Sequence, residues 1–330
     1  MELEFGKLSG RKLQEVGRFL RQQGLEPPVI PPDYTVVLRE DGEITATGSL
    51  KGAVLQHIAV SKAFQGEGLC NTVVSRLVNH AAAQGYSHLM LCTKPENLDL
   101  FCAAGFYPVA QTEQMLLMEN RRDGAARFVS ALPEASAAPV GAIVANCNPF
   151  TRGHRYLAEQ AARSCGFVYF FVLSEDCSRF SARDRMTMAA RSLADLDNVA
   201  VCPTGSYMIS NATFPTYFLK DQSLASRCSM ELDLTVFARR FAAPLGITRR
   251  FVGQEPFCGL TVAYNQTMQD LLPPWGIEVV EIPRAEVHGQ AVSASRVREL
   301  LDQGDWKALT PLVTEETARF LREEWDHRSA

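Results

Sequence analysis

The sequence lacks long hydrophobic runs, an excess of basic charge and paired cysteine motifs. Its longest apolar stretch, Phe167 to Leu173, is far too short to cross a bilayer and is typical of a strand buried on both faces. With 33 Lys and Arg against 37 Asp and Glu, the net charge of −4 leaves no overall basic field for a polynucleotide backbone. These absences argue against both a membrane and a nucleic acid as the partner.

The nine cysteines are scattered, with no C-x-x-C pair and no histidine at metal-ligand spacing. We therefore expect mostly buried thiols in a reducing compartment, and no metal held by side chains. The first residues, MELEFGKLSGRK, alternate polar and apolar side chains and lack the apolar core of a signal peptide. These features together predict a cytoplasmic protein.

The chain is long enough for two domains, with 330 residues of which 46% are hydrophobic and 21% charged. Its composition changes once, at SALPEASAAPV, where small residues and two prolines interrupt any periodic pattern. We expect an N-terminal domain over residues 1–130, a linker over 131–139 and a C-terminal domain over 140–330.

The first domain has the pattern of an α+β fold. A helix is expected from Arg11 to Gln23, followed by strands YTVVLRE and EITATGSL, which Asp41-Gly42 joins as a tight hairpin signal. A strand AVLQHIAV, a glycine turn, a helix from Leu69 to Gln84, a strand HLMLCTK and a helix near NLDLFCAAG follow.

In the second domain, strand and helix signals alternate. Strands are expected at Ala142 to Ala145, Phe167 to Leu173, Val199 to Val201, RRFVG and IEVVEIP, with helices between them. This alternation predicts a doubly wound, Rossmann-like parallel sheet, whose ligands lie at the carboxyl ends of the strands. The segment NPFTRGH falls at such an end.

The Thr-x-Gly-His quartet opens a helix directly after a buried strand. A histidine in the first helical turn lies beside backbone N–H groups without intrahelical partners, so His154 and the positive helix end together suit a phosphate. A turn capped by Gly153 with a surface histidine explains this segment equally well.

A second segment, VSASRVREL, places two hydroxyls and an arginine where another strand gives way to a helix. Ser293 and Ser295 are good N-cap residues, and Arg298 fits an exposed helical charge. The same groups have the chemistry needed to hold a pyrophosphate. The two segments therefore support each other as parts of one phosphate site.

From about residue 140, the chain resembles the nucleotidyltransferase superfamily, with TRGH matching its (H/T)-x-G-H signature and VSASRVR its I-S-S-T-x-x-R signature. Over its whole length it resembles the citrate lyase ligases, which join a GNAT-like acetyltransferase module to a nucleotidyltransferase module. The resemblance is carried by NCNPFTRGHRYL, FVLSEDCSRFSARDR, ATFPTYFLKDQ, FVGQEPF, YNQTM and SASRVRELL.

This resemblance implies ATP-dependent acetylation of a thiol prosthetic group on the acyl carrier subunit of citrate lyase, with release of AMP and pyrophosphate. The implied substrates are ATP with Mg²⁺, acetate, and the carrier with its dephospho-coenzyme A-type thiol group. His154, Thr151 and Arg298 are the implied catalytic residues. The implied ATP-binding residues are Asn148, Phe150, Gly153, Arg185, Ser293 and Ser295, with Lys220 a weaker candidate.

The N-terminal half contains QGEGLC, which is similar to the Gln/Arg-x-x-Gly-x-Gly/Ala loop that holds the coenzyme A pyrophosphate in GNAT proteins. Gln65 and Gly68 match that loop, and Cys70 replaces its last small residue. Two other functions stay open: a nucleotidyltransferase making a dinucleotide or CDP-type product, fused to an active N-acetyltransferase, and an N-terminal half that only binds.

Overall fold

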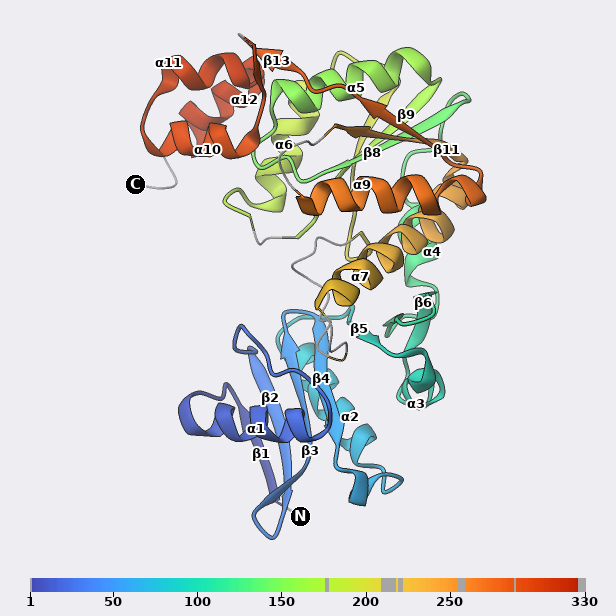
Figure 1. Cartoon of the computed structure of the whole chain (residues 1–330), viewed down its shortest axis with the longest axis vertical. Helices are drawn as coiled ribbons and strands as arrows, with labels where there is room; N and C mark the ends of the chain where they lie inside the picture. Colours follow the sequence, from blue (N-terminus) through green and yellow to red (C-terminus); the bar gives the residue numbers. More distant parts are fainter. Residues whose placement is uncertain are drawn as a thin grey trace. The chain divides into compact units, whose positions relative to one another are not determined.

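The computed structural model describes residues 2–175, 178–208, 218, 222–254, 259–287 and 289–325. Lys220, Cys177, Cys258 and most of ATFPTYFLKDQ lie outside these residues. Contacts between Cα atoms divide the chain into unit 1, Met1–Gly124 with Phe214–Thr235, and unit 2, Ala125–Thr213 with Val236–Ala330 (Figure 1). None of the helices in the described ranges has the length and apolar character needed to span a bilayer.

Unit 1 contains a sheet with seven strands in the described residues, in the order β1-β2-β3-β4-β5-β7-β6. The strands are β1 (Glu2–Gly6), β2 (Tyr34–Glu40), β3 (Glu43–Lys51), β4 (Val54–Val60), β5 (Met90–Thr93), β6 (Tyr107–Gln111) and β7 (Leu116–Glu119). The helices before residue 124 are α1 (Gly10–Gln22), η1 (Lys62–Phe64), α2 (Leu69–Ala83), η2 (Pro95–Asn97) and α3 (Leu98–Ala103). The predicted α+β fold is confirmed, with β1, β6 and β7 beyond the four strands expected above.

The β2–β3 hairpin forms where the sequence predicts it. Asp41 and Gly42 have φ values of 50° and 82°, the left-handed values that a two-residue hairpin turn requires. Successive side chains of β2 point to opposite faces, so Val36 packs with α2 and Val37 packs with α1. The helices α1 and α2 therefore cover opposite faces of the sheet of unit 1.

Unit 2 contains a parallel sheet with five strands in the described residues, in the order β10-β9-β8-β11-β12. The strands are β8 (Val140–Ala145), β9 (Phe167–Val172), β10 (Val199–Pro203), β11 (Ile247–Gly253) and β12 (Glu278–Ile282), with a small hairpin of β13 (Glu286–Val287) and β14 (Gln290–Ala291). This sheet confirms the predicted doubly wound fold.

Most helices from residue 124 onward belong to unit 2, whereas Gln222–Thr235 of α7 belong to unit 1. The helices are α4 (Gly124–Ser130), α5 (Arg152–Ser164), α6 (Ala182–Ser192), α7 (Gln222–Val236), η3 (Phe237–Ala242), α8 (Ala243–Leu245), α9 (Gly259–Leu271), η4 (Pro273–Trp275), α10 (Ala294–Asp302), α11 (Trp306–Leu309), η5 (Thr310–Leu312), α12 (Glu315–Phe320) and η6 (Leu321–Trp325). Figure 1 shows α5 on one side of the sheet and α9 on the other.

The strand order reverses beside β8. The chain moves outward from β8 to β9 and β10, then returns to place β11 on the other side of β8. In open parallel sheets, ligands bind at the carboxyl ends of the strands at this reversal. The loop after β8, which carries TRGH, therefore lies at the position where this fold holds its ligands.

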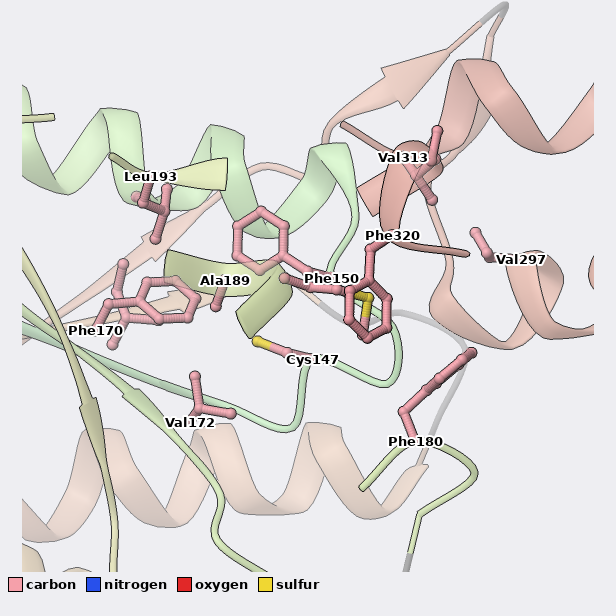
Figure 2. Close-up of a cluster of buried hydrophobic side chains, with 14 of the residues drawn as sticks. Cys147, Phe150, Phe170, Val172, Phe180, Ala189, Leu193, Val297, Val313 and Phe320 are labelled. Atoms are coloured by element: carbon pink, nitrogen blue, oxygen red, sulfur yellow. The ribbon is translucent and has the colours of Figure 1, made fainter. Parts of the chain in front are cut away.

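The core of unit 2 lies directly beneath that loop. The strand β9 is buried along its whole length, as its apolar run predicts. Figure 2 shows Phe150 and Cys147 from the loop among side chains of β9, α6, α10 and the C-terminal helices. Five of the seven cysteines in the described ranges are buried, as expected.

The segment expected to be a linker is held by unit 2. The Tyr169 hydroxyl donates to the Pro133 carbonyl at 2.6 Å, and the Gly166 N–H donates to the Pro139 carbonyl at 2.8 Å. The contact-based division falls earlier, between Gly124 and Ala125. Residues 131–139 thus follow α4 along the body of the second unit.

Candidate functional site

The loop between β8 and α5 is shaped by a left-handed residue and a buried ring. Cys147 has a φ of 55°, which turns the chain sharply where β8 ends. Phe150 is fully buried, with its ring 5.8 Å from Phe170 and 5.4 Å from the His154 ring. Phe150 therefore supports the histidine from within the core, which differs from the ligand contact that the resemblance implies.

The helix α5 begins at Arg152, and Thr151 is its N-cap. The Thr151 hydroxyl accepts from the His154 backbone N–H, and the His154 Nδ1 accepts from the Thr151 backbone N–H at 3.0 Å. This is a capping box in which histidine takes the place of the usual Glu or Gln. The backbone N–H groups of Arg152 and Gly153 have no intrahelical acceptor by position.

The capping box fixes the protonation state of the imidazole. Nδ1 faces a backbone N–H donor, so it must be an unprotonated acceptor, and a neutral ring then carries its proton on Nε2. Burial, together with the smaller effect of the nearby Arg284 charge, lowers the pKa of His154 to about 4. His154 is therefore a neutral hydrogen-bond donor at physiological pH.

The structure brings the two sequence motifs together. Arg298 of α10 donates from Nη1 to the Asn148 carbonyl at 2.6 Å and from Nη2 to the Ser295 hydroxyl at 3.0 Å. A Cβ on Gly153 would stand 3.7 Å from Val292, at ordinary contact distance. The start of α5 and the start of α10 are thus neighbours, as the phosphate-site hypothesis requires.

The start of α10 offers further donors. Ser293 is its N-cap, but its hydroxyl makes no capping hydrogen bond.

Because Gly153 has room for a Cβ within the protein, its lack of a side chain is not required by packing. An approaching ligand, with its own need for space beside Gly153, gives a physical reason for this glycine.

Arg185 is fully buried and holds the neighbouring loops. Its Nε donates to the Phe180 carbonyl at 3.1 Å, Nη1 to the carbonyls of Asn146 at 2.9 Å and Leu173 at 2.7 Å, and Nη2 to the Glu175 carbonyl. All three guanidinium nitrogens therefore serve backbone oxygens after β8 and β9. The structure gives this arginine a bracing position, whereas the resemblance implies an approach to phosphates.

Arg284 is a residue that the sequence argument missed. It follows β12 at the carboxyl edge of the sheet, the same edge that carries TRGH, and its charge acts on His154. Its place directly after the predicted strand IEVVEIP is the signal that could have identified it. Among the described residues, no group of three His, Cys, Asp or Glu side chains could hold a metal ion.

Gln65 and Gly68 lie in unit 1, in the loop before α2. The strands β4 and β5 pair in parallel at two positions, Val54 with Met90 and Leu55 with Leu91. Beyond these pairs, β4 continues without a paired residue of β5. A cavity of about 620 Å³ opens beyond this point. Its lining includes Ile58, Val60, Gln65, Gly68, Cys70 and Lys94. Burial raises the pKa of the Cys70 thiol to about 11, so this thiol is protonated.

Models of known protein families match both the N-terminal and the C-terminal part of the chain. Residues 140–321 match the model of the citrate lyase ligase C-terminal domain, and residues 13–107 match that of the GNAT acetyltransferase family. The chain is 42% identical to [citrate [pro-3S]-lyase] ligase of Klebsiella pneumoniae, with 96% of this chain and 95% of that protein covered. It is 38% identical to the Escherichia coli protein of the same name, with 96% and 92% covered.

Among solved structures, Thermotoga maritima TmcAL bound with alpha-thio ATP aligns at 14% identity and a TM-score of 0.39, over 58% of this chain and 56% of that one. The two family models and the named relatives show that this chain is a two-domain ligase, with a GNAT-like unit followed in the sequence by a parallel-sheet unit. The chain belongs to the citrate lyase ligase family.

Proposed function

We propose that this protein activates acetate with ATP as acetyl-AMP and then acetylates the thiol of the prosthetic group on the citrate lyase acyl carrier. The relatives named for a ligase of citrate lyase support this reaction. The observation that carries it is the capping box, which leaves the Nε2–H of a neutral His154 as a donor at the start of α5. Free thiols among the described cysteines fit a cytoplasmic setting.

In the first step, an acetate oxygen forms a bond to the α-phosphorus of ATP while the bond from that phosphorus to the β-phosphate bridging oxygen breaks. Pyrophosphate leaves with the electron pair. Acetate is ionised at neutral pH, as carboxyl groups with a pKa of about 4 are, and therefore needs no general base. The protein instead has to neutralise and orient the phosphates.

His154 is proposed to donate its Nε2–H to an α-phosphate oxygen as charge develops there. The backbone N–H groups that begin α5 point the same way along the helix axis, and the positive helix end adds to their effect. The Thr151 hydroxyl, which lies 2.9 Å from His154 Nδ1, holds the ring in place and completes the catalytic pair. Phe150 supports this ring from the core.

The pyrophosphate is proposed to lie between the two helix starts, where Gly153 leaves space. The Ser293 and Ser295 hydroxyls and the donors of Arg298 not used by Asn148 would face it, and Asn148 would fix the loop. Mg²⁺ would enter as part of the ATP substrate, held by phosphate oxygens. Arg185 acts through the loops that it braces.

In the second step, the carrier thiol attacks the acetyl carbonyl carbon. The thiol proton passes to solvent, the carbonyl carbon's bond to the phosphate oxygen breaks, and AMP leaves. We propose that the cavity of unit 1 receives the carrier's dephospho-coenzyme A-type arm, with the Gln65 to Gly68 loop facing its pyrophosphate. Backbone N–H groups in such glycine turns suit an anion.

The proposed reaction is tested by exchange of labelled pyrophosphate into ATP. Acetate, ATP and Mg²⁺ without the carrier should give exchange, and carrier should then be acetylated when its thiol form is added. Exchange that requires a mononucleotide instead of acetate would favour the alternative, a nucleotidyltransferase fused to an N-acetyltransferase.

Replacement of Arg298 by lysine should reduce kcat/KM for ATP in the exchange reaction. A lysine keeps the charge but cannot make the two hydrogen bonds of a guanidinium fork, to Asn148 and Ser295, while facing the phosphates. Loss of charge-assisted hydrogen bonds predicts a decrease of about 10-fold to 100-fold.

The matched control for this substitution is Arg296→Lys. Arg296 lies on the same helix and pairs with Glu299 at the surface, 3.0 Å away. Wild-type kinetics for Arg298→Lys would leave the arginine with no role in ATP use.

A side chain at Gly68 should slow acetyl transfer to the carrier while leaving acetate-dependent exchange unchanged. Gly68 has a φ of 78°, and no protein atom lies within 4 Å of an added Cβ. Asparagine tolerates this backbone conformation better than other side chains, so Gly68→Asn separates blocked access from strain.

Transfer is measured at limiting carrier concentration, with Gly85→Asn as control. Gly85 has a φ of 87° and equal space, but it does not line the cavity. Equal transfer rates for Gly68→Asn and wild type would exclude this loop from thiol recognition.

A further inference from the structure

One face of α1 carries a row of arginines. Three arginines and one glutamine lie three or four residues apart, which places them on one side of the helix. They are Arg11, Gln14, Arg18 and Arg21, and all four are exposed. Within the described part of the chain, the side chains of Arg18 and Arg21 form no hydrogen bond or ion pair. Because the whole chain has a net charge of −4, this face stands out as locally positive.

A groove of about 720 Å³ runs along these arginines. Its other wall is made by Pro27 and Pro28, which follow α1. Gly17 of α1 faces this segment, since a Cβ added to Gly17 would lie 3.4 Å from the Pro27 side chain, at van der Waals contact distance. The proline segment is thus held against the helix, and the groove is a built feature of the surface.

Two aliphatic side chains project directly beyond the groove. Val29 is 99% exposed and Ile30 is 67% exposed, between the pairs Pro27-Pro28 and Pro31-Pro32. Prolines restrict the backbone, so these side chains lose little conformational freedom when a partner covers them. An exposed aliphatic pair on a restricted loop, beside a positive groove, has the composition of a protein-binding surface.

The groove adjoins the cavity proposed to receive the thiol arm. Arg21, Pro27 and Pro28 line the groove, while Gln23 and Leu25, from the same turn of chain, line the cavity. A protein bound at the groove therefore lies next to the cavity, because residues 21–28 contribute to the lining of both.

We propose that this groove docks the acyl carrier protein, through carboxylates on the carrier that pair with Arg18 and Arg21 and an apolar patch that covers Val29 and Ile30. The inference rests on the proposed function, since it assigns a place to the macromolecule that bears the thiol. Paired charges at an accessible surface mainly steer association, so the effect lies in carrier binding and depends on ionic strength.

The test uses the full chain with two groove variants, Arg18→Glu/Arg21→Glu and Val29→Ser/Ile30→Ser. With the purified thiol form of the carrier, charge reversal should raise the carrier KM about 10-fold or more at low salt and remove its dependence on NaCl. The serine variant should raise this KM and keep the salt dependence. Acetate-dependent exchange and acetylation of free dephospho-coenzyme A should match wild type in both.

The control Arg76→Glu/Arg122→Glu makes the same change in net charge at exposed residues that do not line the groove. A carrier KM unchanged by groove charge reversal overturns the docking proposal. An equal loss of acetylation with free dephospho-coenzyme A also overturns it, because the groove would then bind the thiol arm. A change in the sedimentation of a groove variant relative to wild type overturns it too, because the groove would then bind a second copy of this chain. Absence of acetate-dependent exchange in the wild type would instead refute the proposed function.

Discussion

Replacing His154 by glutamine should lower the rate of acetate-dependent pyrophosphate exchange by ~10²–10³ while the protein stays folded. Glutamine is a usual capping-box residue at this helix position, so its side chain can accept from the Thr151 N–H as Nδ1 does. The imidazole Nε2–H is then lost and the remaining amide N–H groups are not held in the ring's place, and loss of one preorganised donor typically has an effect of this size. His154→Ala should be equally slow and also less stable by ~1 kcal/mol, because it removes the acceptor of the Thr151 N–H from the capping box.

The pH dependence gives an independent check on the same residue. Because the pKa of His154 is about 4, its titration should produce no step in exchange rate between pH 6 and 8. Between an unfolded pKa near 6.5 and the folded value, the unfolded chain binds more protons, so the free energy of unfolding should fall with decreasing pH, by about 3 kcal/mol. Exchange by His154→Ala within a few-fold of wild type would rule out the donor role, since alanine has no side-chain donor.

Replacing Arg185 by methionine should have the largest effect on stability. The substitution leaves carbonyls of Asn146, Leu173, Glu175 and Phe180 without the donor that now serves them in a buried setting. Removing one partner from such a buried charged network costs about 3–5 kcal/mol. Urea unfolding measures this decrease, and pyrophosphate exchange should be reduced in the protein that remains folded, because the loop after β8 loses its brace.

Arg183→Met is the matched control for Arg185→Met. Arg183 lies two residues away on α6 and is exposed, so its replacement should change the free energy of unfolding by less than about 0.5 kcal/mol. If both variants unfold at the same urea concentration as wild type, the carbonyls do not depend on Arg185.

Local signals predicted much of the fold. The hairpin at Asp41-Gly42 and the strand Tyr34–Glu40 follow from turn chemistry and alternation, and both occur as expected. The fully buried β9 follows from a short apolar run. In contrast, β7 was not expected, because its four buried residues carry no alternation.

The candidate site was predicted in outline only. The proximity of TRGH to VSASRVR follows from the edge that both share, but the Arg298 contact with Asn148 joins residues 150 positions apart. The burial of Arg185 depends on carbonyls from separate loops, which no local pattern encodes. The capping box of Thr151 and His154 was not predicted, because the usual sequence pattern has Glu or Gln at the position of His154.

The division of the chain has a consequence for its synthesis. Unit 1 is built from Met1–Gly124 and Phe214–Thr235, so its last stretch leaves the ribosome after Ala125–Thr213 of unit 2. The first unit cannot be complete while the segment before Phe214 is still being made. Maturation is therefore interleaved, and a nascent chain arrested before residue 214 should be more sensitive to protease in its N-terminal half than the finished protein.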